Sequence, residues 1–341
     1  MTEFEKIMAP VWSSEIIYDE FLMMHEAGGK TEAPLLFEPE YIISVTSADK
    51  TETYEQGRDW TVSGNLLTLT PDSRIFRFTE EEMIFDDKRY GKCFRTRDGR
   101  YSIFSEGHFF HDRQIAVTYK KKPSAPIFTP EFVGDRLPRT MELLEAGKPL
   151  RLLVFGDSIS CGCNSSSFSG VPPYVPKWDQ LLCMGLWRKY GAAVELKNTA
   201  CGGQNSRWAL ENAKALVGEQ YADLAIIAFG MNDRIPEDEF CSNIEKTMEE
   251  ARSIFPHTEF LLCATSFPNP ILDGFMAYQD KYYAALKTLE RDGVAVISFG
   301  EMQNALMKTK RYEDLSGNNV NHPNDFFARC HAQLVMAALS K

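Results

Sequence analysis

A serine and a histidine that lie far apart in the chain have the residue types and surroundings that nucleophilic catalysis requires. Ser158 lies in the segment VFGDSIS, directly after the mostly apolar run 150–153, and His322 lies in NNVNHPND near the end of the chain. A serine hydroxyl is a weak nucleophile until a base removes its proton, and imidazole titrates near neutral pH. The pair therefore indicates attack of Ser158 on a carbonyl carbon, with His322 carrying the proton.

Two further segments offer groups that stabilise negative charge. Gly203 lies in NTACGGQNS and Asn232 lies in FGMNDR. A backbone N–H in a glycine turn and a side-chain amide are neutral donors of the kind that form an oxyanion hole. Together with the backbone N–H of Ser158, they predict a hole with three donors, in which Gly202 is the alternative to Gly203.

Each of these residues also has an ordinary structural interpretation. Ser158 could cap a helix, Asn232 could cap the next helix, and Gly203 could serve a plain turn. His322 could be a surface histidine that packs against the following proline. Asp157 is assigned to holding the turn before Ser158 and not to catalysis.

The elements that would position these residues follow from the pattern of the second half of the chain. Apolar runs predict strands at 150–155, 194–198, 224–229, 260–264 and 294–298. Amphipathic patterns predict helices at 178–190, 206–217, 238–255, 278–292 and about 326–339. Such alternation predicts a parallel sheet covered on both faces, a three-layer α/β domain. Ligands of such sheets bind outside the carboxyl ends of the strands, where the four segments would meet.

The first half of the chain has a different pattern, of short alternating runs. WTVSGNLLTLTP (60–71) predicts a hairpin, and RIFRF (74–78), RYSIFSE (100–106) and QIAVTYK (114–120) predict further strands. We therefore expect a small β-sandwich, jelly-roll-like, over residues 1–125, a linker over 126–149 and the α/β domain over 150–341. The prolines of KKPSAP (121–126) favour the boundary.

Composition limits the possible partners and the compartment. A net charge of −11 argues against nucleic acid or an anionic membrane as a partner, and the short run 120–122 is the one basic cluster. The start of the chain lacks a leader pattern and no long apolar stretch follows, so we expect a cytoplasmic protein. The eight scattered cysteines are expected to be reduced, with Cys161 and Cys163 as ordinary thiols and not zinc ligands.

In their order along the chain, four motifs resemble the sequence blocks of the SGNH hydrolases, also called the GDSL esterase and lipase superfamily. They are Gly156-Asp157-Ser158-Ile159, the turn at Gly203, Gly230-Met231-Asn232-Asp233 and His322-Pro323. The resemblance covers roughly residues 150–341. It implies a flavodoxin-like three-layer fold and ester hydrolysis through an acyl-serine. A β half in front of such a domain is similar to the arrangement in several carbohydrate-acting members.

One position departs from the family pattern. The family usually has an aspartate three residues before the histidine, and Asn319 stands there. In serine proteases, exchanging the triad aspartate for asparagine lowers turnover about ten-thousandfold. A backbone carbonyl could orient His322 in its place, or a carboxylate elsewhere, with Asp314 the nearest upstream. We expect a Ser158–His322 dyad that a carbonyl or Asn319 orients.

The substrate expected from the sequence is an acyl ester of a polar alcohol. The loops 161–176 and 266–275 combine aromatic and small polar residues without a long apolar run, which favours a short acyl group, acetyl above all, on a carbohydrate. The reaction requires no metal and no organic cofactor. Alternatives are an acyltransferase that uses the same acyl-serine and a non-catalytic glycan-binding protein. His108, His111 and Arg113 are expected to be solvated residues at a strand end.

Overall fold

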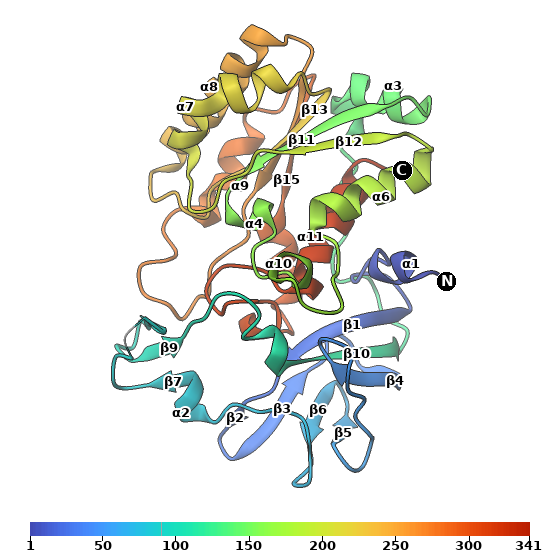
Figure 1. Ribbon diagram of the computed structural model, residues 1–341, viewed down its shortest axis with the longest axis vertical. Helices are drawn as coiled ribbons and strands as arrows, with labels where there is room; N and C mark the ends of the chain where they lie inside the picture. Colours follow the sequence, from blue (N-terminus) through green and yellow to red (C-terminus); the bar gives the residue numbers. More distant parts are fainter. Residues whose placement is uncertain (90) are drawn as a thin grey trace.

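Five parallel strands form the sheet on which the candidate site is built. The computed structural model, which describes residues 1–89 and 91–341, orders them β12-β11-β13-β14-β15 (Figure 1). Their bounds are Leu150–Gly156 (β11), Val194–Asn198 (β12), Leu224–Ala228 (β13), Glu259–Ala264 (β14) and Val294–Ser298 (β15). This is the strand order of the flavodoxin-like fold, so the predicted fold class is confirmed.

Helices cover both faces of this sheet, and the side chains of the strands alternate between them. Leu152 and Val154 of β11 pack in one apolar cluster with Trp178 and Phe326, whereas Leu153 and Phe155 pack in another with Phe240 and Tyr282. The helices of the first face are α3 (Pro138–Glu145), α6 (Trp178–Tyr190), α10 (Phe299–Leu306) and α11 (Asp325–Ala338). Those of the second face are α7 (Ser206–Leu216), α8 (Glu237–Ile254) and α9 (Gln279–Lys287).

The first half of the chain forms antiparallel sheets below the α/β layers (Figure 1). One sheet has the order β1-β10-β4, with strands Ile16–Met23, Gln114–Lys121 and Pro39–Ser47. A second has the order β2-β3-β6-β5, with strands Glu26–Ala27, Lys30–Pro34, Leu66–Leu69 and Trp60–Ser63. A third has the order β7-β9-β8, with strands Ile84–Phe85, Tyr101–Ile103 and Cys93–Arg95. Short helices α1 (Glu3–Ile7) and α2 (Glu80–Met83) complete this half.

The predictions for this half are partly correct. The hairpin expected at 60–71 is present as β5 and β6, and the later two runs contain β9 and β10. The strand expected at 74–78 was wrong, because only Phe78 forms a bridge there, with His25. The reason is side-chain bonding: both the backbone N–H and the guanidinium of Arg74 donate to the buried carboxylate of Asp59, which holds the segment away from a ladder.

The segment expected to be a linker, 126–149, is not a free connection. It contains α3, which buries Leu137, Met141 and Leu144 in the core beside the parallel sheet. The backbone N–H of Thr140 donates to a carboxylate oxygen of Glu259 at 2.8 Å. The spacing of the three apolar residues is that of a helix face, a signal that the prolines obscured.

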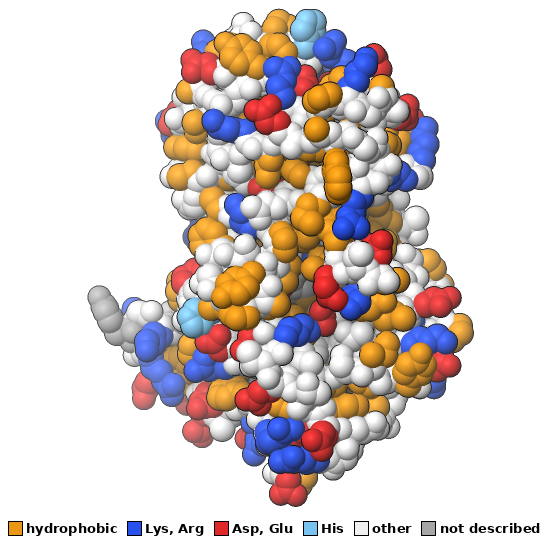
Figure 2. All heavy atoms as spheres, turned by 45° about the vertical axis from the view of Figure 1, so that its right-hand side comes forward, with side chains coloured by type: hydrophobic (Ala, Val, Ile, Leu, Met, Phe, Trp, Pro, Cys, Tyr) orange, Lys and Arg blue, Asp and Glu red, His pale blue; other side chains and the backbone are white. Residues whose placement is uncertain are grey.

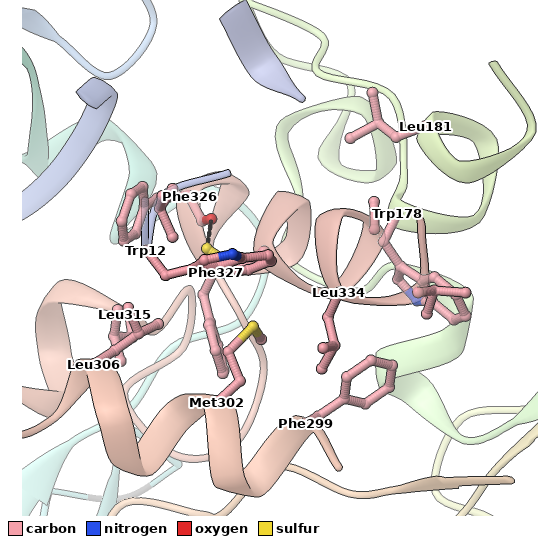
Figure 3. Close-up of a cluster of buried hydrophobic side chains, with 14 of the residues drawn as sticks. Trp12, Trp178, Leu181, Phe299, Met302, Leu306, Leu315, Phe326, Phe327 and Leu334 are labelled. Carbon is pink, nitrogen blue, oxygen red and sulfur yellow. Dashed lines mark hydrogen bonds between the residues drawn. The ribbon is translucent and has the colours of Figure 1, made fainter. Parts of the chain in front are cut away.

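Both halves of the chain contribute to one apolar cluster. Figure 3 shows Trp12, which precedes β1, among Phe326, Phe327 and other residues of the α/β layers. A buried ion pair reinforces the contact, with Lys310 Nζ 2.6 Å from a carboxylate oxygen of Glu20. The two halves therefore pack through a shared interior. None of the helices in residues 1–89 and 91–341 has the length and apolar character needed to cross a bilayer.

Candidate active site

Ser158 lies at the first position of a short helix, α4 (Ser158–Cys161), directly after β11. Asp157 precedes it and caps this helix, since its Oδ1 accepts a hydrogen bond from the backbone N–H of Ile159 at 2.9 Å. Asp157 is 1% exposed, and this burial raises the pKa of its carboxyl to about 7. The carboxyl therefore holds the turn, as expected, and Ser158 is left at the carboxyl edge of the sheet.

His322 reaches Ser158 across the sheet edge. Its Nε2 lies 2.8 Å from Ser158 Oγ, a hydrogen-bond distance, and the two residues are 8% and 7% exposed. The loop before α11 fixes this position: the backbone N–H of Gly317 donates to the carbonyl of His322, and Asn318 Oδ1 accepts from the backbone N–H of His322. The residues predicted as nucleophile and base are thus in direct contact.

The other ring nitrogen of His322 faces two acceptors. Nδ1 lies 2.6 Å from Asn164 Oδ1 and 3.3 Å from Glu106 Oε2. The amide of Asn164 can adopt only one orientation, because its Nδ2 donates to the carbonyl of Gly107 at 2.8 Å. Nδ1 of His322 must then carry the hydrogen. Nε2 is left as an acceptor that faces the hydroxyl of Ser158.

Asn319 does not orient His322, contrary to the expectation from the sequence. Its side-chain Nδ2 donates to Ser102 Oγ at 3.1 Å and to the carbonyl of Ile103 at 3.0 Å, and its Oδ1 accepts from Asn269 at 3.1 Å. The amide therefore ties the histidine loop to β9.

Asp314, the alternative carboxylate named from the sequence, is also engaged elsewhere. It is fully buried and accepts from the backbone N–H of Met23 at 2.8 Å and from Arg311 at 3.0 Å. Sequence reasoning missed Glu106 and Asn164, although Glu106 ends the run predicted as a strand at 100–106 and Asn164 lies in the loop 161–176.

The expected oxyanion donors lie at the same edge as Ser158. Gly202 and Gly203 are the central residues of a turn from Cys201 to Gln204, in which Gly203 has a φ of +76°. A Cβ atom on Gly202 would lie 3.8 Å from that of Ser158, so the turn is adjacent to the nucleophile. Asn232 Nδ2 donates to the carbonyl of Gln204 at 2.9 Å, which leaves its second hydrogen for a ligand.

Other residues noted in the sequence lie outside this arrangement. His108 is exposed and pairs with Asp112, whereas His111 is buried, with Nε2 2.8 Å from the carbonyl of Pro172, so the expectation that it is solvated was wrong. The guanidinium of Arg113 lies over the ring of Phe109. Cys161 and Cys163 are free thiols, and burial raises the pKa of Cys163 to about 12.

A separate recess opens on the face shown in Figure 2, at the waist between the two halves. It has a volume of about 380 Å³ and lies between α1, β1, α6 and α11, where Phe4, Phe21 and Arg329 are among its lining residues. Ser158 and His322 do not line it.

Comparison with known families agrees with this geometry. Residues 154–328 match the sequence model of the GDSL-like lipase/acylhydrolase family. The chain belongs to this family. The matched segment of this GDSL-family protein contains Ser158, Gly203, Asn232 and His322.

Solved structures with a similar fold include two carbohydrate esterases. A two-domain esterase active on acetylated mannans, co-crystallised with mannopentaose, matches with a TM-score of 0.50 and 19% identity over 62% of this chain and 54% of its own. Axe2, an acetylxylan esterase from Geobacillus stearothermophilus, matches with a TM-score of 0.48 and 17% identity over 58% of this chain and 97% of its own. The GDSL-family chain thus spans about half the length of the mannan esterase. No curated protein sequence matches it.

Proposed function

We propose that this GDSL-family protein is a serine esterase that removes short acyl groups, acetyl above all, from a carbohydrate or a similar polar alcohol. The observation that carries the proposal is the 2.8 Å contact between Ser158 Oγ and His322 Nε2, with the opposite ring nitrogen held as a donor. A serine in that contact has a base that can take its proton at the moment of attack.

The reaction would proceed in two halves. Ser158 Oγ attacks the ester carbonyl carbon while its proton passes to His322 Nε2, and His322 then returns that proton to the leaving alcohol oxygen. The acyl group stays on Ser158 as an ester. A water molecule next attacks this ester, gives a proton to His322 and releases the carboxylic acid, while Ser158 recovers its hydrogen.

The negative charge on the carbonyl oxygen would be stabilised by the backbone N–H groups of Ser158 and Gly203 and by the side chain of Asn232. The bond between Asn232 and the carbonyl of Gln204 supports this role, because it fixes the amide beside the glycine turn. Donors that are fixed before the reaction need no reorganisation when charge develops, and each is worth about 3–4 kcal/mol of barrier.

The substrate class is supported by the openness of the site and by the relatives. Gly202 and Gly203 are exposed and carry no side chains, so the edge beside Ser158 is open to a bulky alcohol. The fold is shared with an esterase active on acetylated mannans. A short acyl group on a sugar fits an open polar edge better than a lipid chain, which needs a long apolar cavity. The cytoplasmic location expected from the sequence stays a prediction.

Acetate release from acetylated mannooligosaccharides tests the proposal. The native protein should release acetate, and Ser158→Ala should lower the rate at least about a thousandfold. Ser160→Ala is the matched control, because Ser160 is a buried serine of the same helix. Equal rates for the native protein and Ser158→Ala would contradict the proposal. Release of acetyl only to a second sugar, with no free acetate, would instead identify an acyltransferase.

A further inference from the structure

Glu106 brings a carboxylate from the first half of the chain to the catalytic histidine. We propose that it is a positioning residue, and that its charge stabilises the protonated ring of His322 beside the neutral acceptor Asn164. The inference rests on the proposed function. Glu106 Oε2 lies 3.3 Å from His322 Nδ1, although 216 residues separate them in the chain. The β half thereby supplies the carboxylate that residue 319 lacks.

A neutral amide alone cannot stabilise the positive charge that forms on the His322 ring during the proposed reaction. Asn164 accepts the hydrogen of Nδ1 and so sets the tautomer, but it carries no charge to stabilise the imidazolium that forms when Ser158 loses its proton. The carboxyl group of Asp157 also interacts with the charge of His322. Burial raises the pKa of Asp157 to about 7, so near neutral pH this group is protonated much of the time. Glu106 is therefore the steady source of negative charge.

The surroundings of Glu106 hold it in place. Its Oε1 accepts from Asn318 Nδ2 at 3.2 Å, and Asn318 Oδ1 accepts from three backbone N–H groups of the histidine loop, those of residues 320, 321 and 322. Asn164 donates to the carbonyl of Gly107, the next residue. One acceptor of His322 Nδ1 is therefore the side chain of Glu106, and the other, Asn164, is bonded to the neighbouring backbone at Gly107.

The direction in which the pKa of the Glu106 carboxyl is shifted agrees with this role. Partial burial raises the pKa of its carboxyl, but the hydrogen bond to His322, the charge of that ring and the hydrogen bonds with Asn318 and Asn164 together outweigh burial and hold the pKa below its usual value of 4.5. The Glu106 side chain is 52% exposed, so water screens its charge. We therefore expect a smaller effect than that of a buried triad aspartate, about tenfold to hundredfold in kcat.

Glu106→Gln tests the proposal, since it keeps the shape and the acceptor for Asn318 but removes the charge. With p-nitrophenyl acetate, kcat should fall about tenfold to hundredfold with KM nearly unchanged, and labelling of Ser158 by a fluorophosphonate should slow by a similar factor. Asp112→Asn, an exposed carboxylate of the same loop, is the matched control.

A second variant separates charge from shape. Glu106→Asp keeps the negative charge on a side chain that is one methylene shorter, and it should retain more of the native kcat than Glu106→Gln. The proposal is overturned if Glu106→Gln has native kcat, or if only KM rises, which would make Glu106 a substrate contact. It is also overturned if Glu106→Asp is no faster than Glu106→Gln. A native protein that labels at Ser158 but releases no acetate from acetylated sugars would refute only the substrate class.

Discussion

Asn164 Oδ1 lies 2.6 Å from His322 Nδ1, although 158 residues separate the two in the chain. The acceptor that orients the base therefore comes from the loop after the nucleophile and not from the position three residues before the histidine. Close packing between the two loops holds Asn164 beside His322. A Cβ atom on Gly317 would lie 2.7 Å from that of Asn164, so only glycine allows the histidine loop to approach this closely.

Restoring the family's usual aspartate at position 319 should not improve the enzyme. In Asn319→Asp the two hydrogens given to Ser102 Oγ and the carbonyl of Ile103 are lost, and a 2% exposed carboxylate faces a carbonyl. We expect a loss of at least about 1–3 kcal/mol in the free energy of unfolding and no rise in kcat. Urea unfolding and p-nitrophenyl acetate hydrolysis measure the two effects. A higher kcat than that of the native protein would show that residue 319 can orient His322 after all.

Removal of the side-chain donor of the proposed oxyanion hole, Asn232, should lower kcat. Asn232→Ala deletes an amide that the carbonyl of Gln204 holds in place, and we expect kcat to fall about a hundredfold to a thousandfold with little change in KM. Steady-state kinetics with p-nitrophenyl acetate check this. Asn212→Ala is a matched control, because that amide donates to the carbonyl of Trp208 within α7. A native kcat in Asn232→Ala would exclude this residue from the hole.

Asp157 should make the stability of the fold depend on pH. Burial raises the pKa of its carboxyl from 3.8 to about 7, so between these values the folded protein keeps a proton that the unfolded chain releases. The free energy of unfolding therefore loses a contribution as pH rises through this window, by about 1.4 kcal/mol per pH unit at most.

Asp157→Asn keeps the oxygen that accepts from the backbone N–H of Ile159 but does not titrate. Its stability relative to the native protein should rise between pH 5 and pH 8, by up to about 3 kcal/mol, as measured by urea unfolding at both pH values. A difference that stays constant with pH would mean that the carboxyl titrates normally.

The buried ion pair between the two halves should be sensitive to loss of its cation. Lys310→Met leaves the fully buried carboxylate of Glu20 without its charge partner, at a cost of about 3–5 kcal/mol in the free energy of unfolding. Lys214→Met, which removes an exposed lysine paired with Glu250, should cost less than about 1 kcal/mol. Chemical denaturation of both variants compares them. Similar small losses in the two would show that Lys310 contributes little to the packing of the halves.

The parallel sheet could be predicted from the sequence because its strands other than the edge strand β12 are mostly apolar on both faces, and because helices with a clear period separate them. The strands β12 and β15 and the helix α6 have the predicted bounds. The segment 74–78 was misread because an alternating run is also compatible with an extended segment that side chains hold, here through Arg74 and Asp59. Helix α3 was missed because two prolines suggested a linker.

Short sequence motifs were sufficient to predict those site residues whose setting is recognisable from their neighbours in the chain. Ser158, Gly203, Asn232 and His322 each follow a strand or precede a helix in a recognisable setting, and the structure brings them to one edge of the sheet. Glu106 and Asn164 could not be found in this way. Their contacts with His322 depend on how a loop of the β half and the loop after α4 fold over the sheet edge, and no spacing along the chain encodes that.

The most direct test of the central claim is covalent labelling with a fluorophosphonate, located by peptide mass mapping, in the native protein and in His322→Ala. We predict a single adduct on Ser158 in the native protein and labelling at least about a hundredfold slower in His322→Ala, because the hydroxyl is reactive only through its contact with Nε2. An adduct on another residue, or equal labelling rates in the two proteins, would contradict the account.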